Sequence, residues 1–74
     1  MTHRMTAVIE HDPESGLFVG LIPGIPGAHS QGATLDELIK NLKEVTELCL
    51  AEQPDIIPQG LPEFVGLQQI EITT

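Results

Sequence analysis

The chain has 74 residues, of which 11 are acidic and only 3 are Lys or Arg, giving a formal net charge of −8. This length allows one domain, which buries only about 60% of the surface exposed by its unfolded chain. The charge argues against binding to nucleic acid or to anionic membranes, because both require clustered basic side chains. It favours encounter with a basic protein surface, although net charge also keeps small proteins in solution.

Internal cross-links are not expected to support this small domain. Cys49 is the single cysteine, so no disulfide can close within the chain. The three histidines are scattered rather than set at the spacing of metal ligands. Small domains without such support commonly rely on oligomerisation. We therefore expect a homo-oligomer or a protein partner, and no bound metal or cofactor.

No targeting or membrane segment is expected. No run of the sequence approaches the roughly 20 apolar residues of a membrane span, and the N-terminus lacks a secretory signal pattern. A cytoplasmic protein is therefore predicted, and an unpaired cysteine suits a reducing compartment.

The first 22 residues predict a β-hairpin. Residues 5–11 alternate in polarity as a strand does, and residues 12–16 are dense in turn-forming types. Residues 17–22 form a second strand that is apolar almost throughout. Such a strand is typical of burial on both faces or against a partner.

The segment 23–33 predicts a break in the second strand. Two prolines and two glycines in residues 23–27 remove backbone donors and permit positive φ. Residues 28–31 are short enough to form either a third strand or an extended link.

A long amphipathic helix is the clearest local prediction. Thr34 and Glu37 match a capping box, in which the Thr hydroxyl accepts a backbone N–H and the Glu side chain reaches back. The helix is expected to end near Glu52, because Pro54 cannot continue it. Its apolar face follows the i, i+3, i+4, i+7 spacing. The residues on this face are Leu35, Leu38, Ile39, Leu42, Val45 and Cys49.

The C-terminal part predicts a loop at 55–62 and a last strand at 63–74. Its alternation changes parity, which indicates either a bulge near Gln68 and Gln69 or pairing by the later residues alone. We expect the strongest strand character at 68–73. The predicted order β-β-β-α-β gives an α+β fold over residues 1–74, with one helix on one face of a small antiparallel sheet.

Glu10, Asp12 and Glu14 are the one cluster that could hold a catalytic metal. Two-metal catalysis needs several carboxylates that converge on ions about 4 Å apart. Asp12 and Glu14 fall in a turn, and no second acidic set appears in the other predicted strands. We therefore interpret them as solvated carboxylates able to face a partner.

No other residues predict catalysis. His29 and Ser30 are neighbours in an extended segment, so their side chains point to opposite faces. Cys49 falls on the apolar face of the helix, which indicates a core residue rather than a nucleophile. The glycines lack the Lys of a phosphate-binding loop, and two phenylalanines are too few for base stacking. We expect no enzyme activity.

Joined motifs in residues 5–50 resemble the HicB-like antitoxin family. They are a strand ending in acidic residues, a Pro-x-x-Pro-Gly turn, Ser-Gln-Gly, a Thr-x-x-Glu cap and Asn-Leu-Lys-Glu within the helix. The resemblance assigns structural roles to Pro26, Gly27, Ser30, Gln31, Gly32, Thr34, Glu37 and Asn41. Ala28 stands where the family often has cysteine, and Gly24 where an acidic residue is frequent.

The resemblance implies a partial RNase H-like fold that binds and masks a small basic, HicA-like toxin that cleaves messenger RNA. It implies no nuclease activity. We expect no separate C-terminal DNA-binding domain of the kind that many family members carry, and hence no direct contact with nucleic acid. Two alternatives stay open: an orphan domain whose strand edges pair between copies, and a metal-dependent RNase H-like nuclease that uses Glu10 and Asp12.

Overall fold

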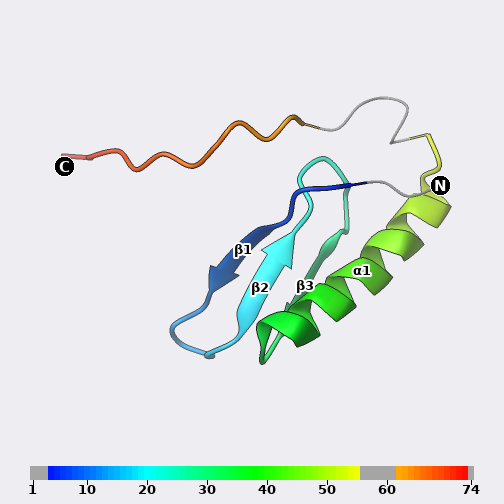
Figure 1. Ribbon diagram of the computed structural model, residues 1–74, viewed down its shortest axis with the longest axis horizontal. Coiled ribbons are helices and arrows are strands. Elements are labelled where there is room, and N and C mark those ends of the chain that lie inside the picture. Colours follow the sequence, from blue (N-terminus) through cyan, green and yellow to red (C-terminus); the bar gives the residue numbers. More distant parts are fainter. Residues whose placement is uncertain (1–3, 56–61, 74) are drawn as a thin grey trace.

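The computed structural model describes residues 4–55 and 62–73. The strands form a three-stranded antiparallel sheet in the order β1-β2-β3, and α1 packs on one of its faces (Figure 1). The elements are β1 (Val8–His11), β2 (Phe18–Leu21), β3 (His29–Gly32) and α1 (Leu35–Glu52). The predicted α+β class, with a small sheet and one long helix, is confirmed.

The hairpin of β1 and β2 forms where the sequence predicts it, with shorter strands. His11 lies opposite Phe18 at the turn end of the ladder. Gly16 adopts φ 74°, which a residue with a side chain rarely does. Its N–H donates to the Asp12 carbonyl at 2.9 Å, which closes the turn.

The segment between β2 and α1 contains a strand, so the choice between a third strand and a link is decided in favour of the strand. The turn before it uses Gly24 and Gly27 with φ of 89° and 86°. Within this turn the Ala28 N–H donates to the Ile25 carbonyl at 3.1 Å.

Helix α1 has the predicted bounds. Thr34 is the N-cap with extended backbone, and its hydroxyl accepts the Glu37 N–H at 3.1 Å. The reciprocal bond from the Thr34 N–H to the Glu37 side chain is not present among the described residues, so half of the predicted capping box forms. At the other end the Gln53 N–H donates to the Cys49 carbonyl at 2.9 Å.

The core lies between α1 and the β2–β3 part of the sheet. Leu38 is fully buried, and Cys49 is half-buried against the core cluster, as expected. Leu35, predicted on the apolar face, is 50% exposed, whereas the unpredicted Thr46 is buried. The cluster of buried side chains consists of Ile22, Ile25, Ala28 and Leu42.

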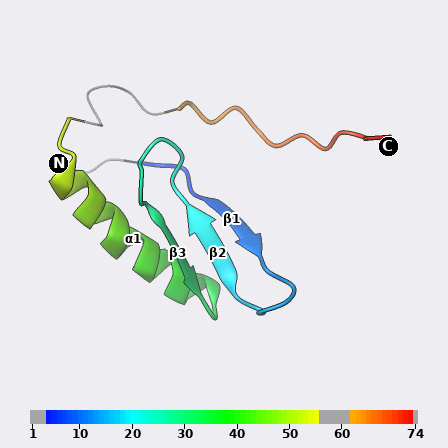
Figure 2. The same ribbon diagram turned by 180° about the vertical axis from the view of Figure 1, so that it is seen from behind.

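The predicted fourth strand is wrong for the described residues 62–73. They run extended from the body without strand pairing (Figures 1 and 2). The physical reason is that none of the described strands lies beside them to share a hydrogen-bond ladder. Most of the predicted loop 55–62, together with Thr74, lies outside the described residues. Within the described part of the chain, no helix is long and apolar enough to cross a membrane.

Candidate protein-binding surface

The Asp12 carboxylate organises the β1–β2 turn. It accepts hydrogen bonds from the Ser15 hydroxyl at 2.6 Å, the Ser15 N–H at 3.2 Å and the Glu14 N–H at 3.4 Å. These donors, the Ser15 hydroxyl first, hold the pKa of Asp12 below its ordinary value of 3.8. Ser15 Oγ in turn accepts the Leu17 N–H at 3.2 Å. Asp12 is therefore an anion at neutral pH whose oxygens are largely engaged by the turn.

The other two acidic residues of this cluster are exposed. Glu10 lies in β1 opposite Val19, and Glu14 lies in the turn. Beside them, His11 Nε2 is 3.2 Å from the Gly16 carbonyl, and its ring centroid is 4.7 Å from that of Phe18. In the part of the chain that the structure describes, no three His, Cys, Asp or Glu side chains are placed to hold a metal ion. Glu10 and Glu14 offer accessible negative charge, as the sequence predicts.

One face of the sheet is left uncovered by α1. A Cβ added at Gly20 would lie 3.3 Å from a methyl of Leu38, so Gly20 faces the helix. Neighbouring strand residues alternate between faces, so Val19 and Leu21 face the opposite way. Cross-strand partners share a face, and the register therefore defines this surface, here called the open face. Its members are Val8, Glu10, Val19, Leu21, His29 and Gln31.

The open face has an apolar centre with polar neighbours. Val8 and Val19 are half-buried, and Leu21 is 45% exposed. No helix or strand among the described residues packs on it, since α1 contacts β2 and β3 from the other side. The apolar run of residues 17–22 signalled two-sided burial or a partner. However, the face itself could not be predicted, because it depends on register.

His29 and Ser30 point to opposite faces of β3, as predicted. His29 lies opposite Leu21 on the open face, and Ser30 lies opposite Gly20 on the helix face. They therefore cannot form a nucleophile and base with each other.

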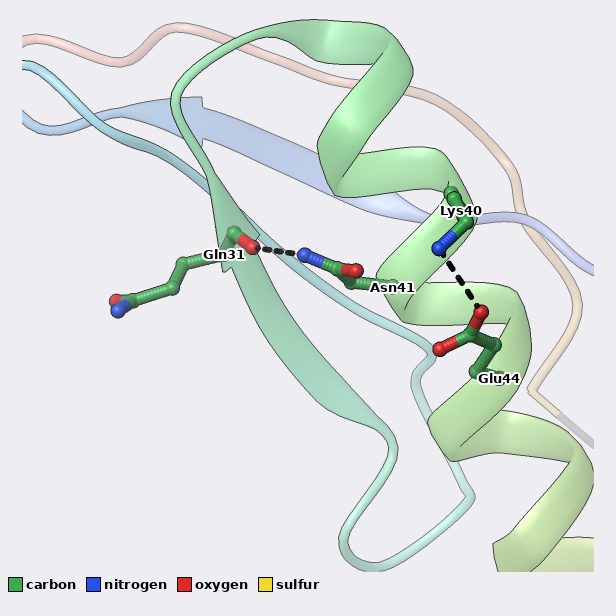
Figure 3. A network of polar contacts seen from close by, with 4 residues as sticks. All are labelled: Gln31, Lys40, Asn41 and Glu44. Carbon is green, nitrogen blue, oxygen red and sulfur yellow. Dashed lines mark hydrogen bonds and ion pairs between the residues drawn. The ribbon is translucent and has the colours of Figure 1, made fainter.

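The residues of the family-like motif hold β3 and its turn against α1. A Cβ at Gly32 would lie 2.5 Å from the Leu38 backbone nitrogen, so only glycine allows this approach. The Asn41 side chain donates to the Gln31 carbonyl at 3.0 Å (Figure 3). Together with the Thr34 cap, these contacts fix how the first two turns of α1 lie on β3.

The Pro-Gly turn is fixed at the far end of the helix. The Gln53 side chain donates to the Pro26 carbonyl at 3.4 Å. A Cβ at Gly27, which has positive φ, would lie 3.3 Å from the Cys49 sulfur. These contacts hold the Pro-Gly turn against the C-terminal end of α1.

The solvent side of α1 adds to the negative charge. Lys40 and Glu44 form an exposed ion pair at 3.3 Å (Figure 3), which is worth a few tenths of a kcal/mol. Lys43 is the other basic residue on the helix. The exposed acidic residues on it are Asp36, Glu37, Glu44, Glu47 and Glu52.

Comparison with known proteins places the chain among small proteins of matching length. It is 51% identical over 69 residues to a UPF0150 protein of Thermotoga maritima, covering 93% of this chain and 89% of that protein. It is 42% identical over 65 residues to a UPF0150 protein of Synechocystis, covering 88% of each. It is 39% identical over 71 residues to a UPF0150 protein of Archaeoglobus fulgidus, covering 96% of this chain and 97% of that protein. No family model and no solved structure matches the chain significantly.

Proposed function

This chain belongs to the UPF0150 family, and we propose that it acts as a HicB-like antitoxin that binds a small basic toxin and blocks its cleavage of RNA. The observation that carries the proposal is the open face, where exposed Leu21 and half-buried Val8 and Val19 lie beside Glu10 on a strongly acidic protein. A basic toxin would bury the apolar centre and meet negative charge around it.

The apolar centre of the open face and the net negative charge contribute to binding in different ways. Burial of Leu21 and its apolar neighbours supplies affinity, because interface energy concentrates in the desolvated centre. The net charge of −8 accelerates encounter with a cationic partner and disfavours acidic ones. The motif residues Gly32 and Asn41 hold β3 against α1, whereas the Gln31 side chain lies on the open face beside Val19.

The test is co-expression with a small basic protein encoded beside this chain. Co-expression should relieve the toxicity of that protein, and the purified complex should not cleave RNA. The proposal fails if the neighbouring protein forms no complex with this chain, or cleaves RNA unhindered by it.

A matched pair of variants locates the contact. Leu21→Arg places a charge on the open face and should abolish binding. Leu48→Arg places the same charge on α1, where Leu48 is also exposed, and should leave binding intact. Circular dichroism checks that both variants fold. Equal affinities for the two folded variants would contradict the assignment of the open face.

A nuclease is disfavoured by the geometry of the acidic turn, because three donors already occupy the Asp12 carboxylate. Hydrolysis assays on RNA and RNA–DNA hybrids with Mg²⁺ or Mn²⁺ separate the two functions. Activity that disappears in Glu10→Ala would support the nuclease and oppose the antitoxin proposal.

A further inference from the structure

The segment 62–73 has apolar side chains but no partner within the described chain. Val65 is 95% exposed and Ile70 is 74% exposed. Among the described residues, this segment makes one hydrogen bond, which the Gln68 side chain donates to the Gln69 carbonyl. Within it, Ile70 and Ile72 alternate with polar neighbours, which is the pattern of a strand that covers a core with one face.

The extended segment makes the chain larger than a compact protein of its mass. The radius of gyration is 14.1 Å, against about 11 Å for a compact domain of this length. The accessible surface is 6119 Å², against about 4,450 Å² for a folded monomer of 8.0 kDa. The excess of roughly 1,700 Å² per chain is larger than the roughly 800 Å² that each partner buries in a standard interface.

The outer edge of β3 is partly occupied. Hydrogen-bonded and non-hydrogen-bonded pairs alternate along an antiparallel ladder. The Ile22 N–H donates to the Ala28 carbonyl at 2.9 Å, so the backbone groups of His29 and Gln31 point outward. The His29 N–H already donates to Gly27, and the Gln31 carbonyl already accepts from Asn41.

The outer edge of β1 is open. The Asp12 N–H donates to the Leu17 carbonyl at 2.8 Å, so the same alternation points the backbone groups of Ile9 and His11 outward. Within the described residues, these groups have no hydrogen-bond partner. Helix α1 does not contact β1, and Ile9, which lies opposite Gly20, is 38% exposed. A strand added here would gain a ladder and cover Ile9.

We propose that residues 62–73 of one copy pair with the open edge of β1 in a second copy, and reciprocally, so that two chains form a strand-exchanged dimer. In its own chain an open cleft of about 500 Å³ lies between residues 62–66 of the segment and residues 4–6. It then runs away from β1, as both ribbon views show (Figures 1 and 2). This outstretched conformation leaves each edge free for another copy and directs each segment outward. In a twofold dimer the same contact forms twice, so the outer edge of β1 is paired in both copies.

The dimer is independent of any toxin and is tested on the full chain alone. Light scattering coupled to size exclusion should give a dimer that dissociates on dilution. Ile70→Lys/Ile72→Lys should raise the dimer dissociation constant more than about a hundredfold. Gln69→Lys/Thr73→Lys adds the same charge to the polar face of the same segment and should leave a dimer. A monomeric wild-type chain at high concentration overturns the proposal, as does a dimer unaffected by the isoleucine substitutions.

Proline substitutions identify the edge. Ile9→Pro removes an outward N–H from β1 without removing a ladder bond, and should give a folded monomer. Gln31→Pro does the same at β3 and should remain dimeric. If Ile9→Pro does not fold, His11→Pro removes the other outward donor of β1. A folded variant of β1 that still dimerises contradicts the proposed edge.

A mixture of two variants that each fail to dimerise alone tests whether segments are exchanged between copies. Ile9→Pro keeps the segment, and Ile70→Lys/Ile72→Lys keeps the edge. Their equimolar mixture should form a heterodimer through one intact pairing, although neither variant dimerises alone. A mixture that stays monomeric overturns exchange between copies.

Discussion

The body, residues 4–55, and the extended segment, residues 62–73, have similar apolar character but opposite exposure. In the body, Leu38 is fully buried and the strands share ladders. In the segment, Leu67 is 85% exposed and the backbone has no ladder. The contrast teaches that apolar alternation alone does not make a strand, because a strand also requires a neighbouring edge.

The largest effect should come from truncating Leu38, which lies over Gly20 and Gly32 at the centre of the contact between sheet and helix. Leu38→Ala should lower the free energy of unfolding by about 3–4 kcal/mol, because it removes buried methyl groups and leaves a cavity. Urea denaturation measures the loss. The matched Leu67→Ala in the exposed segment should cost the body almost nothing, and equal losses would erase the distinction between the two regions.

A second contrast uses two glycines. Gly32→Ala places a methyl against the Leu38 backbone, which cannot move as a flexible side chain can. We expect a loss of about 2–3 kcal/mol from overpacking. Gly66→Ala adds a methyl with no atom within 4 Å and should leave thermal unfolding unchanged. A neutral Gly32→Ala would show that β3 does not closely approach α1.

Thr46 offers a stabilising change within the body. Its hydroxyl is buried and has no hydrogen-bond partner among the described residues. Thr46→Val keeps the branched shape and removes the unsatisfied group, so we expect a gain of about 1 kcal/mol in the free energy of unfolding. A loss in calorimetry would mean that the hydroxyl has a partner in solution.

The smallest effect should come from the Asp12 turn. Because the folded pKa of Asp12 is lowered, its stabilising contribution is complete above the ordinary value of 3.8 and disappears as pH falls through the folded value. Asp12→Asn should therefore lower the melting temperature slightly at neutral pH and lose that difference in strong acid. Glu63→Gln removes a carboxylate from the extended segment and should follow the wild type. A difference between Asp12→Asn and the wild type that persists in strong acid would contradict this account.

Much of the body could be predicted from the sequence because its signals are local. The Thr34 cap, the stop before Pro54 and the Gly16 turn each depend on residues within a few positions. The burial of Thr46 in place of Leu35 was missed, since helical spacing gives a face but not how the sheet covers it. The sequence also indicated exposed charge at Glu10 and Glu14.

The candidate surface was harder to predict. The open face exists because register pairs Val8 with Leu21 and Glu10 with Val19, and register is set by contacts distant in sequence. The alternation of Ile70 and Ile72 predicts a strand, which residues 62–73 do not form within this chain. The alternation carries no information on whether the strand edge that pairs with this segment belongs to the same chain or to another copy.

Hydrogen exchange resolved to single amides tests most directly the claim that the extended segment is completed by another copy. At high concentration, amides of residues 68–73 and the outward amides of Ile9 and His11 should exchange slowly. On dilution both sets should lose protection together, while the core amides of α1 remain protected. Protection of residues 68–73 that does not change with concentration, or is absent at every concentration, would contradict the account.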